Sequence, residues 1–326
     1  MDTKKLKKVL KKELFLANKV FIIGHNDLDL DAIGAICGVN LITKKFNKKT
    51  YAIIDDEYLE PGVEKILSRI KHDLNIVNKE QTKELITPNS LLIVVDTNKE
   101  KLLCLSNLIK EFKDIIIIDH HRSNNDTIKT NNAFIMEDAS STCEIITELI
   151  KEFRIKLEPV EATLLFAGIV LDTNNFTLKA NRKTFYYAYY LLSKGASVGE
   201  TQYLLKQDMP RFIKNGKILA NTNYITDNIV VATGEKHEIY QREDLAKVAD
   251  TLLQFNEIKT SFVIGYIDKD EIGISARSTS SLDVGKIMEK LDGGGNKTEG
   301  ATRLTETNIK KVEKELIEII KNKIKE

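Results

Sequence analysis

The feature that most constrains this chain is a series of short apolar segments separated by stretches of helical periodicity. Such segments are typical of strands buried on both faces of a parallel sheet, with the intervening helices covering those faces. In the first half of the chain they occupy residues 20–23, 50–54, 91–95 and 115–118. We therefore predict an α/β fold with a mostly parallel sheet. Polar residues that follow these segments should lie at its carboxyl edge, where ligands bind.

The pattern changes near residue 215. A helical stretch over residues 183–219 is interrupted near Gly195 and Pro210. Shorter strands and helices follow it: predicted strands at 228–233, 261–266 and 271–276, and predicted helices at 245–253, 282–291 and 308–325. We predict an N-terminal domain over residues 1–185, a helical connector over 186–215 and a smaller C-terminal α/β domain over 216–326.

Charge and cysteine content exclude several classes of protein. The 49 basic and 48 acidic residues give a net charge of +1, which argues against binding long nucleic acids along a basic face. The three cysteines form no C-x-x-C pair, which argues against a zinc ribbon and suits a reducing cytosol. No apolar run is long enough to span a bilayer, and the lysine-rich start lacks the apolar stretch of a secretory signal. We expect a cytoplasmic protein with no membrane partner.

Acidic and imidazole side chains follow three of the predicted strands and one predicted helix. The segments are His25–Asp31, Asp96–Asn98, Asp119–His121 and Asp172–Asn174, and they contain three of the five histidines in the chain. A single aspartate after a strand is most often a helix cap or a turn residue. Four such segments at one sheet edge would repel each other unless a cation lay between them. Together they predict a metal site.

The kinds of ligand indicate which metal and which chemistry. Carboxylates with a few imidazoles suit Mn²⁺ or Mg²⁺ better than structural zinc, which prefers thiolates. Enough ligands are present for two ions that share one carboxylate. Two adjacent ions can activate a water and hold the oxygens of a phosphoryl group during an in-line displacement.

The C-terminal domain carries a second signal. Arg277 and Ser278 end a predicted strand, where the arginine should be an exposed cation. The run Gly293, Gly294 and Gly295 precedes Asn296, and consecutive glycines let backbone N–H groups approach a phosphate. Alone, the glycine run would be a flexible turn. Together with the arginine, which can bind an anion through two N–H groups, it favours an anion pocket.

These motifs resemble the DHH superfamily of phosphoesterases and its companion DHHA1 domain. The resemblance covers nearly the whole chain, and Asp119–His121 carries the superfamily signature. Within the superfamily, the chain is most similar to the catalytic portion of GdpP-type cyclic di-AMP phosphodiesterases, on these stretches: residues 29–35, 140–144, 167–173, 176–178, 249–253, 261–265 and 274–278. Those enzymes usually carry membrane helices and sensory domains ahead of this portion. The resemblance therefore implies a stand-alone form, with a piece of a longer protein as the alternative.

The resemblance also implies a role for each residue. Six metal ligands would form two groups: His25 and Asp29 for one ion, Asp31, His120 and Asp172 for the second, and Asp96 bridging both. Catalysis would depend on Asp96, His120 and His121, with His121 beside the scissile phosphate and Asp119 orienting its neighbours. The nucleotide would contact these residues: His121, Arg277, Ser278, Gly293, Gly294, Gly295 and Asn296.

Two positions depart from the family pattern. Asn296 stands where the family's glycine motif usually ends in histidine, so a neutral amide replaces a group that can carry charge. Asp27 is an extra acid in the first motif, and a turn residue is its simplest interpretation.

The predicted function is hydrolysis of cyclic di-AMP to pApA by a metal-bridging hydroxide, with two divalent cations, Mn²⁺ favoured over Mg²⁺. Further cleavage to AMP is left open, and the family allows a homodimer. One alternative is a nanoRNase-type oligoribonuclease that acts on pApA or short RNA. An alternative of another class is an inactive nucleotide-binding sensor. An inorganic pyrophosphatase of the same superfamily would carry a C-terminal basic cluster, which we do not find.

Overall fold

The computed structural model describes residues 3–55, 59–105, 108–123, 126–206, 208–236 and 238–325. Contacts divide the chain into two units, Met1–Lys206 and Gln207–Glu326. The division falls inside the predicted connector. Helices α7 (Arg182–Ser193) and α8 (Val198–Leu204) pack against α6 (Pro159–Asp172), so they belong to the first unit.

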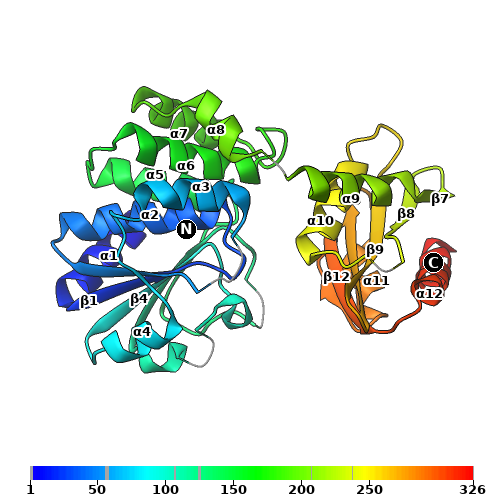
Figure 1. The fold of residues 1–326 in the computed structure, drawn as a ribbon, viewed down its shortest axis with the longest axis horizontal. Coiled ribbons are helices and arrows are strands. Elements are labelled where there is room, and N and C mark those ends of the chain that lie inside the picture. Colours follow the sequence, from blue (N-terminus) through cyan, green and yellow to red (C-terminus); the bar gives the residue numbers. More distant parts are fainter. Residues whose placement is uncertain are drawn as a thin grey trace. The chain divides into compact units, whose positions relative to one another are not determined.

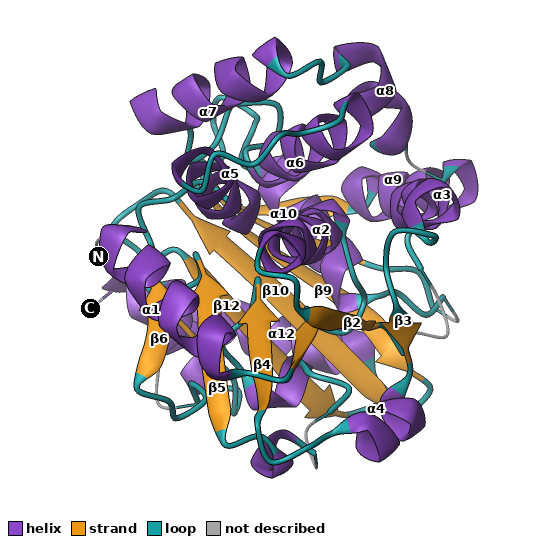
Figure 2. Ribbon diagram, turned by 90° about the vertical axis from the view of Figure 1, so that its left-hand side faces the viewer, coloured by secondary structure: helices purple, strands orange, loops and turns teal. Residues whose placement is uncertain are grey.

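A six-stranded parallel sheet forms the centre of the first unit, in the order β3-β2-β1-β4-β5-β6. Figure 2 shows most of these strands side by side. Their bounds are β1 Lys19–Ile23, β2 Lys49–Ile53, β3 Ile76–Val77, β4 Ser90–Val95, β5 Asp114–Asp119 and β6 Asn132–Ile135. The four predicted strands occupy its middle, which confirms the predicted parallel α/β arrangement. The two edge strands were not predicted because they are only two and four residues long.

Helices cover both faces of this sheet, as the apolar strands require (Figure 1). Val20 and Ile22 of β1 contribute to the core that includes α2, α5 and α6, whereas Phe21 and Ile23 contribute to the core on the opposite face. The remaining helices of this unit are α1 Thr3–Leu16, α2 Leu30–Lys45, α3 Pro61–Ile70, α4 Lys79–Leu85 and α5 Thr142–Glu152.

The second unit contains a mixed six-stranded sheet in the order β11-β12-β10-β9-β8-β7. Among the named strands of this sheet, only β8 and β9 pair in parallel. Its strands are β7 Thr222–Thr226, β8 Ile229–Thr233, β9 Thr260–Asp268, β10 Glu271–Ser278, β11 Gly294–Gly295 and β12 Glu299–Thr305. Its helices are α9 Met209–Ala220, α10 Arg242–Leu252, α11 Val284–Glu289 and α12 Ile309–Lys325.

The glycine run of the second unit forms an edge strand. Gly294 and Gly295 pair with Ala301 and Gly300 of β12. Gly295 has a φ of +152°, and a Cβ there would come within 2.2 Å of the Glu299 carbonyl oxygen. Only glycine fits this position without displacing the neighbouring strand.

None of the described helices is both long and apolar enough to cross a membrane.

Candidate metal centre and catalytic site

The parallel sheet brings the predicted ligands to one edge. His25 and Asp29 follow β1, Asp96 follows β4, and His120 follows β5, and these three strands are neighbours in the sheet. Asp172 is the last residue of α6. Because the carboxyl ends of parallel strands meet at the same edge, residues far apart in sequence converge there.

Among the described residues, potential ligand side chains form three overlapping groups, one of which (Asp96, His120 and His121) shares a residue with each of the other two. Cluster A consists of His25, Asp29 and Asp96, and cluster B consists of Asp31, His120 and Asp172; within each, potential ligand atoms lie within 4.8 Å of one another. The Oδ2 of Asp96 lies 3.5 Å from His25 Nε2, and its Oδ1 lies 3.5 Å from His120 Nε2. Asp96 therefore presents one carboxylate oxygen to each cluster, as a bridging ligand would.

Backbone conformation holds Asp96 in this place. Its φ is +59°, a left-handed value that is uncommon for an aspartate, and its N–H donates to the Ile118 carbonyl oxygen at 3.1 Å. Such strained conformations persist where surrounding structure fixes them, and they concentrate at functional sites. Asp27 also has a left-handed φ, +57°, is exposed and belongs to none of the clusters found among the described residues, which agrees with a turn residue.

Backbone amides hold the two aspartates of the first motif. Asp29 is the N-cap of α2, and its Oδ1 accepts from the N–H groups of Asp31 and Ala32, both at 2.9 Å. Asp31 is fully buried and accepts from the first amides of α5: Thr142 N–H at 2.7 Å and Cys143 N–H at 2.8 Å, one to each oxygen. Each carboxylate is thus fixed before any cation binds.

Close packing of three helices supports Asp31 from behind. A Cβ on Gly168 of α6 would lie 2.5 Å from Cys143 Sγ and 2.8 Å from Asp31 Oδ1. A Cβ on Gly34 of α2 would also lie 2.5 Å from Cys143 Sγ. Glycine is required at both positions because α2, α5 and α6 approach closely at this point.

The last residue of β5 contacts His121. Asp119 is fully buried, and its Oδ1 lies 2.8 Å from His121 Nδ1 and accepts from the His121 N–H at 3.1 Å. Asn98 donates from Nδ2 to Asp119 Oδ2 at 2.7 Å. Asp119 is absent from the groups of potential ligands found among the described residues, and its contacts with His121 are of the kind expected for an orienting residue. Half of the His121 side chain is exposed.

Crowding of the acids perturbs their pKa values. Burial, then the charge of Asp172, raises the pKa of Asp31 to about 6. Burial, then the charge of Asp29, raises the pKa of Asp172 to about 7. Burial and the charge of Asp31 raise the pKa of Asp96 well above its ordinary value. Without a cation, the site therefore resists holding all of its negative charge.

The imidazoles respond to different surroundings. Burial, then the charge of His121, lowers the pKa of His120 to about 4, so this ring is neutral, as a metal ligand must be. Burial opposes protonation of His121, but Asp119 outweighs it and raises the pKa of His121. Burial likewise opposes protonation of His25, but Asp29 and Asp96 raise its pKa well above the ordinary value.

The residues present fit a pair of divalent cations. Among the described residues, His120 Nε2 is one of three buried side-chain polar atoms without a well-formed hydrogen bond, although Asp172 Oδ2 lies 3.0 Å away. A buried, neutral imidazole nitrogen that faces carboxylates is what a metal ligand needs. The donor set is four carboxylates and two imidazoles, which suits a hard divalent ion such as Mn²⁺ or Mg²⁺.

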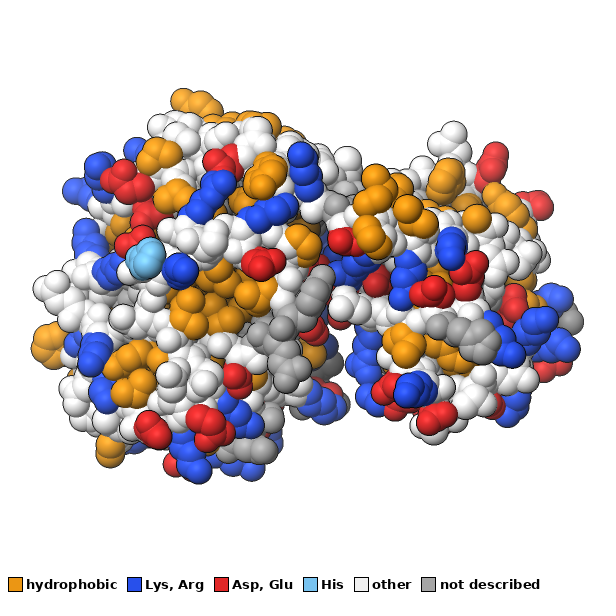
Figure 3. Space-filling model, viewed as in Figure 1, with side chains coloured by type: hydrophobic (Ala, Val, Ile, Leu, Met, Phe, Trp, Pro, Cys, Tyr) orange, Lys and Arg blue, Asp and Glu red, His pale blue; other side chains and the backbone are white. Residues whose placement is uncertain are grey.

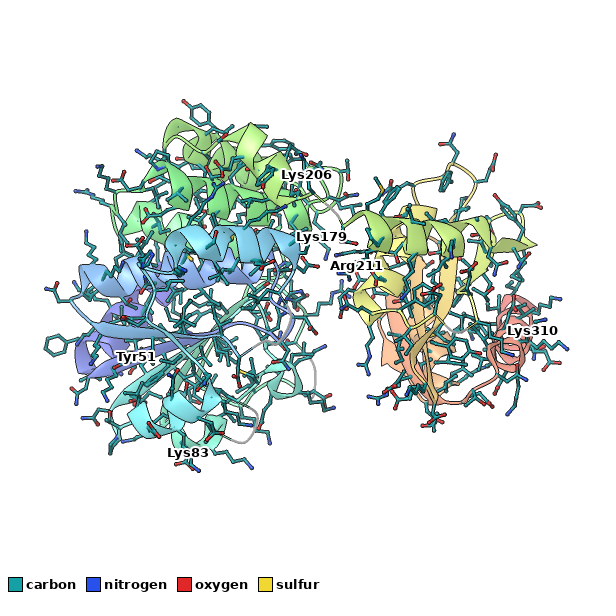
Figure 4. All side chains as sticks on the ribbon, viewed as in Figure 1. Tyr51, Lys83, Lys179, Lys206, Arg211 and Lys310 are labelled. Carbon is teal, nitrogen blue, oxygen red and sulfur yellow. The ribbon has the colours of Figure 1, made fainter. Side chains whose placement is uncertain are left out.

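Sequence reasoning missed several residues of this site. Lys179, labelled in Figure 4, lies between α6 and α7, and its positive charge is among the influences that lower the pKa values of Asp172 and His120. Asn98 was quoted only as part of a motif, yet it holds Asp119. Composition could not reveal either role, because each depends on contacts across the fold.

The predicted nucleotide-binding residues all belong to the second unit, apart from His121. Arg277 lies opposite Glu299 of β12, and Gly295 pairs with Gly300 of the same strand, so they share one end of the sheet. The expectation of an exposed Arg277 cation is wrong. Only 17% of its side chain is exposed, and its Nε donates to Asp250 Oδ1 of α10 at 2.9 Å.

The neighbouring polar groups also have structural partners. Ser278 is buried, and its hydroxyl lies 3.0 Å from the hydroxyls of Thr260 and Ser280. The Oδ1 of Asn296 accepts from the N–H groups of Thr298 and Glu299, at 2.8 and 3.0 Å. The asparagine therefore shapes the turn before β12, which its neutral amide does well.

Comparison with known proteins assigns the family. The DHH family, N-terminal domain, matches residues 19–169, and the DHHA1 domain matches residues 221–326. The chain belongs to the DHH family and has the DHH–DHHA1 domain order.

Two relatives and one solved structure illustrate the similarity. The cyclic-di-AMP phosphodiesterase GdpP of Geobacillus thermodenitrificans is 36% identical over 311 residues, which is 93% of this chain and 47% of that protein. This chain thus spans about half the length of that relative. The bifunctional oligoribonuclease and PAP phosphatase NrnA of Mycoplasma genitalium is 28% identical over 295 residues, 87% of this chain and 88% of that protein. An exopolyphosphatase-related protein from Bacteroides fragilis has the same fold, with a TM-score of 0.80, 21% identity and coverage of 99% and 98% of the two chains.

Proposed function

We propose that this chain is a two-metal phosphodiesterase that hydrolyses cyclic di-AMP to pApA. The observation that carries the proposal is the division of Asp96 between two clusters, one oxygen facing His25 and the other facing His120. A relative named for cyclic di-AMP hydrolysis, 36% identical over almost the whole chain, supports the choice of substrate.

Clusters A and B would each hold one divalent cation, Mn²⁺ favoured over Mg²⁺, with Asp96 shared. When bound, the pair would lower the pKa of a water and offset the charge of the phosphate. The chain's own contribution is to fix the ligands in advance: amides hold Asp29 and Asp31, and a left-handed backbone holds Asp96. Preorganised groups need not rearrange as the reaction proceeds.

His121 would assist the leaving group. Asp119 engages its Nδ1 and raises its pKa, which favours a protonated ring whose Nε2–H can donate. During hydrolysis the water gives up a proton to solvent as its oxygen forms the new bond to phosphorus. The bond to the 3′ oxygen breaks, and the 3′ oxygen takes a proton from a general acid, which solvent then reprotonates. We assign the donation of that proton to His121, a contribution of general acid catalysis.

The second unit would bind the rest of the nucleotide. We assign this binding to Arg277, Ser278, the glycine run Gly293–Gly295 and Asn296. Arg277 Nε already donates to Asp250, and the Ser278 hydroxyl already contacts Thr260, so these two residues would bind the nucleotide through atoms that those contacts do not use. On the face that Figure 3 shows, acidic and basic side chains are interspersed over both units. Such a surface suits a small nucleotide better than a long nucleic acid.

The test is a comparison of substrates. The purified chain is incubated with Mn²⁺ and, separately, with cyclic di-AMP, pApA and a short RNA, and the products are separated by chromatography. We expect rapid loss of cyclic di-AMP with accumulation of pApA. Asp96→Asn should lower the rate by more than the roughly 100-fold typical of a residue that only supports a ligand. Full activity of that variant in metal-defined buffer would refute the assignment.

A second candidate is an oligoribonuclease that releases mononucleotides. This candidate is supported by the similarity to the oligoribonuclease NrnA of Mycoplasma genitalium, which extends over most of both chains. The same metal clusters would serve both reactions. Slow loss of cyclic di-AMP beside rapid conversion of pApA or RNA to mononucleotides would select this candidate.

A further inference from the structure

The rotation of the Asp96 carboxylate decides whether each cluster receives one of its two oxygens. Its Oδ1 faces cluster B and its Oδ2 faces cluster A, each 3.5 Å from an imidazole nitrogen. Rotation about the terminal torsion of an aspartate meets only a shallow barrier. Backbone geometry alone therefore cannot keep each oxygen on its own cluster, and another group must fix the rotation.

Thr142 supplies such a contact. Its hydroxyl donates to Asp96 Oδ1 at 2.9 Å, and its backbone N–H donates to Asp31 Oδ2 at 2.7 Å. The residue is fully buried. One residue at the start of α5 thus contacts a carboxylate that follows β4 and another in the first turn of α2.

The hydroxyl is available because another residue caps the helix. The side chain of Ser141, the N-cap of α5, accepts from the Glu144 N–H at 3.0 Å. A threonine hydroxyl inside a helix usually donates to the carbonyl four residues earlier, as Thr147 does to the Cys143 carbonyl oxygen at 2.7 Å. At the first helical position no such carbonyl belongs to the helix, so the Thr142 hydroxyl reaches Asp96 instead.

We propose that Thr142 is a positioning residue that fixes the rotation of the Asp96 carboxylate, so that its two oxygens stay divided between the two clusters. The proposal rests on the two-metal function proposed above. The Thr142 hydroxyl contacts the oxygen that faces cluster B, so its loss should weaken binding of the cation at cluster B more than at cluster A. The backbone N–H on Asp31 survives any side-chain substitution, which isolates the effect of the hydroxyl.

The chain offers a matched control. Thr147 lies in the same helix and is equally buried, but its hydroxyl serves only the helix backbone. Thr147→Val therefore removes the same atom from the same environment without touching Asp96. Thr142→Ser keeps the hydroxyl and removes only a methyl group.

The test is titration of Mn²⁺ into the metal-free protein by calorimetry, with the unfolding of each metal-free variant measured alongside. The wild type should bind two ions. Thr142→Val should weaken one of them by about 10–100-fold, the range for residues that orient a metal ligand. Thr142→Ser should bind both ions like the wild type, and Thr147→Val should show unchanged affinities. If Thr142→Val does not fold, Thr142→Ala is measured in its place with the same expectation.

The outcomes separate this proposal from the function. A wild type that binds no ion refutes both. If the wild type binds two ions and Thr142→Val binds both as tightly as Thr147→Val does, the role of Thr142 is refuted but the two-metal function is not. Loss of affinity in Thr142→Ser as large as in Thr142→Val would also refute it, because the hydroxyl would then not be the group that matters.

Discussion

Replacement of Asp172 by asparagine should stabilise the metal-free protein. Burial and neighbouring charge raise the pKa of this carboxyl from 3.8 to about 7. A shift of roughly three units, at about 1.4 kcal/mol per unit, corresponds to an upper limit of ~4 kcal/mol. The repulsion is shared with other acids of the site, and the side chain is 17% exposed, so we expect a gain of about 1–3 kcal/mol in the free energy of unfolding.

The sign of the pH dependence follows from the same shift. The folded state holds this proton more tightly than the unfolded chain does. Asp172 therefore costs no stability below its unfolded pKa near 4, and its cost grows as pH rises toward about 7 and is constant above that. The advantage of Asp172→Asn should be largest at pH 8 and should shrink as pH falls toward 4.

The assay is urea unfolding with excess chelator, followed by circular dichroism at pH 8 and pH 4.5. Asp138→Asn, at an exposed turn of the same unit, is the control and should show no such gain. With Mn²⁺ added, the wild type should become more stable than Asp172→Asn, since only the wild type retains the full ligand set and is stabilised by binding. If Asp172→Asn is no more stable than the wild type at pH 8 without metal, the reasoning from crowded charge is wrong.

Three further predictions concern the same site. Mn²⁺ binding at pH 6 should release protons from Asp31 and Asp172, because their raised pKa values leave both partly protonated. Calorimetry in buffers of different ionisation enthalpy measures the proton release, and equal binding heats in all buffers would contradict the prediction. His121→Gln should lower kcat by about 10²–10⁴-fold with both metals still bound, and an unchanged kcat would remove the assigned acid role. Gly168→Ala should cost roughly 1–3 kcal/mol of stability by overpacking against Asp31, whereas Gly216→Ala, with no atom within 4 Å of its new Cβ, should be neutral or stabilising in urea unfolding.

Much of the fold could be predicted because the central strands are buried on both faces. Residues 20–23, 91–95 and 115–118 read as continuous apolar runs for that reason, and they lie within or next to the bounds of β1, β4 and β5. Convergence of their polar neighbours at one edge then followed from parallel pairing.

Other features depend on contacts that no local pattern encodes. Thr142 contacts Asp96, 46 residues away, and Asp31, 111 residues away, so neither contact could be inferred from spacing. The ion pair between Arg277 and Asp250 joins β10 to α10 and could not be anticipated from the strand alone. The edge strand formed by Gly294 and Gly295 was not predicted either, because glycine disfavours strands and only the neighbouring backbone requires it here.

The most direct test of the account is the location of metal in crystals grown with Mn²⁺, by anomalous scattering. The account predicts two peaks about 3.5–4 Å apart, one among the residues of cluster A and one among those of cluster B, with Asp96 between them. A single peak, or two peaks that do not share Asp96, would contradict it.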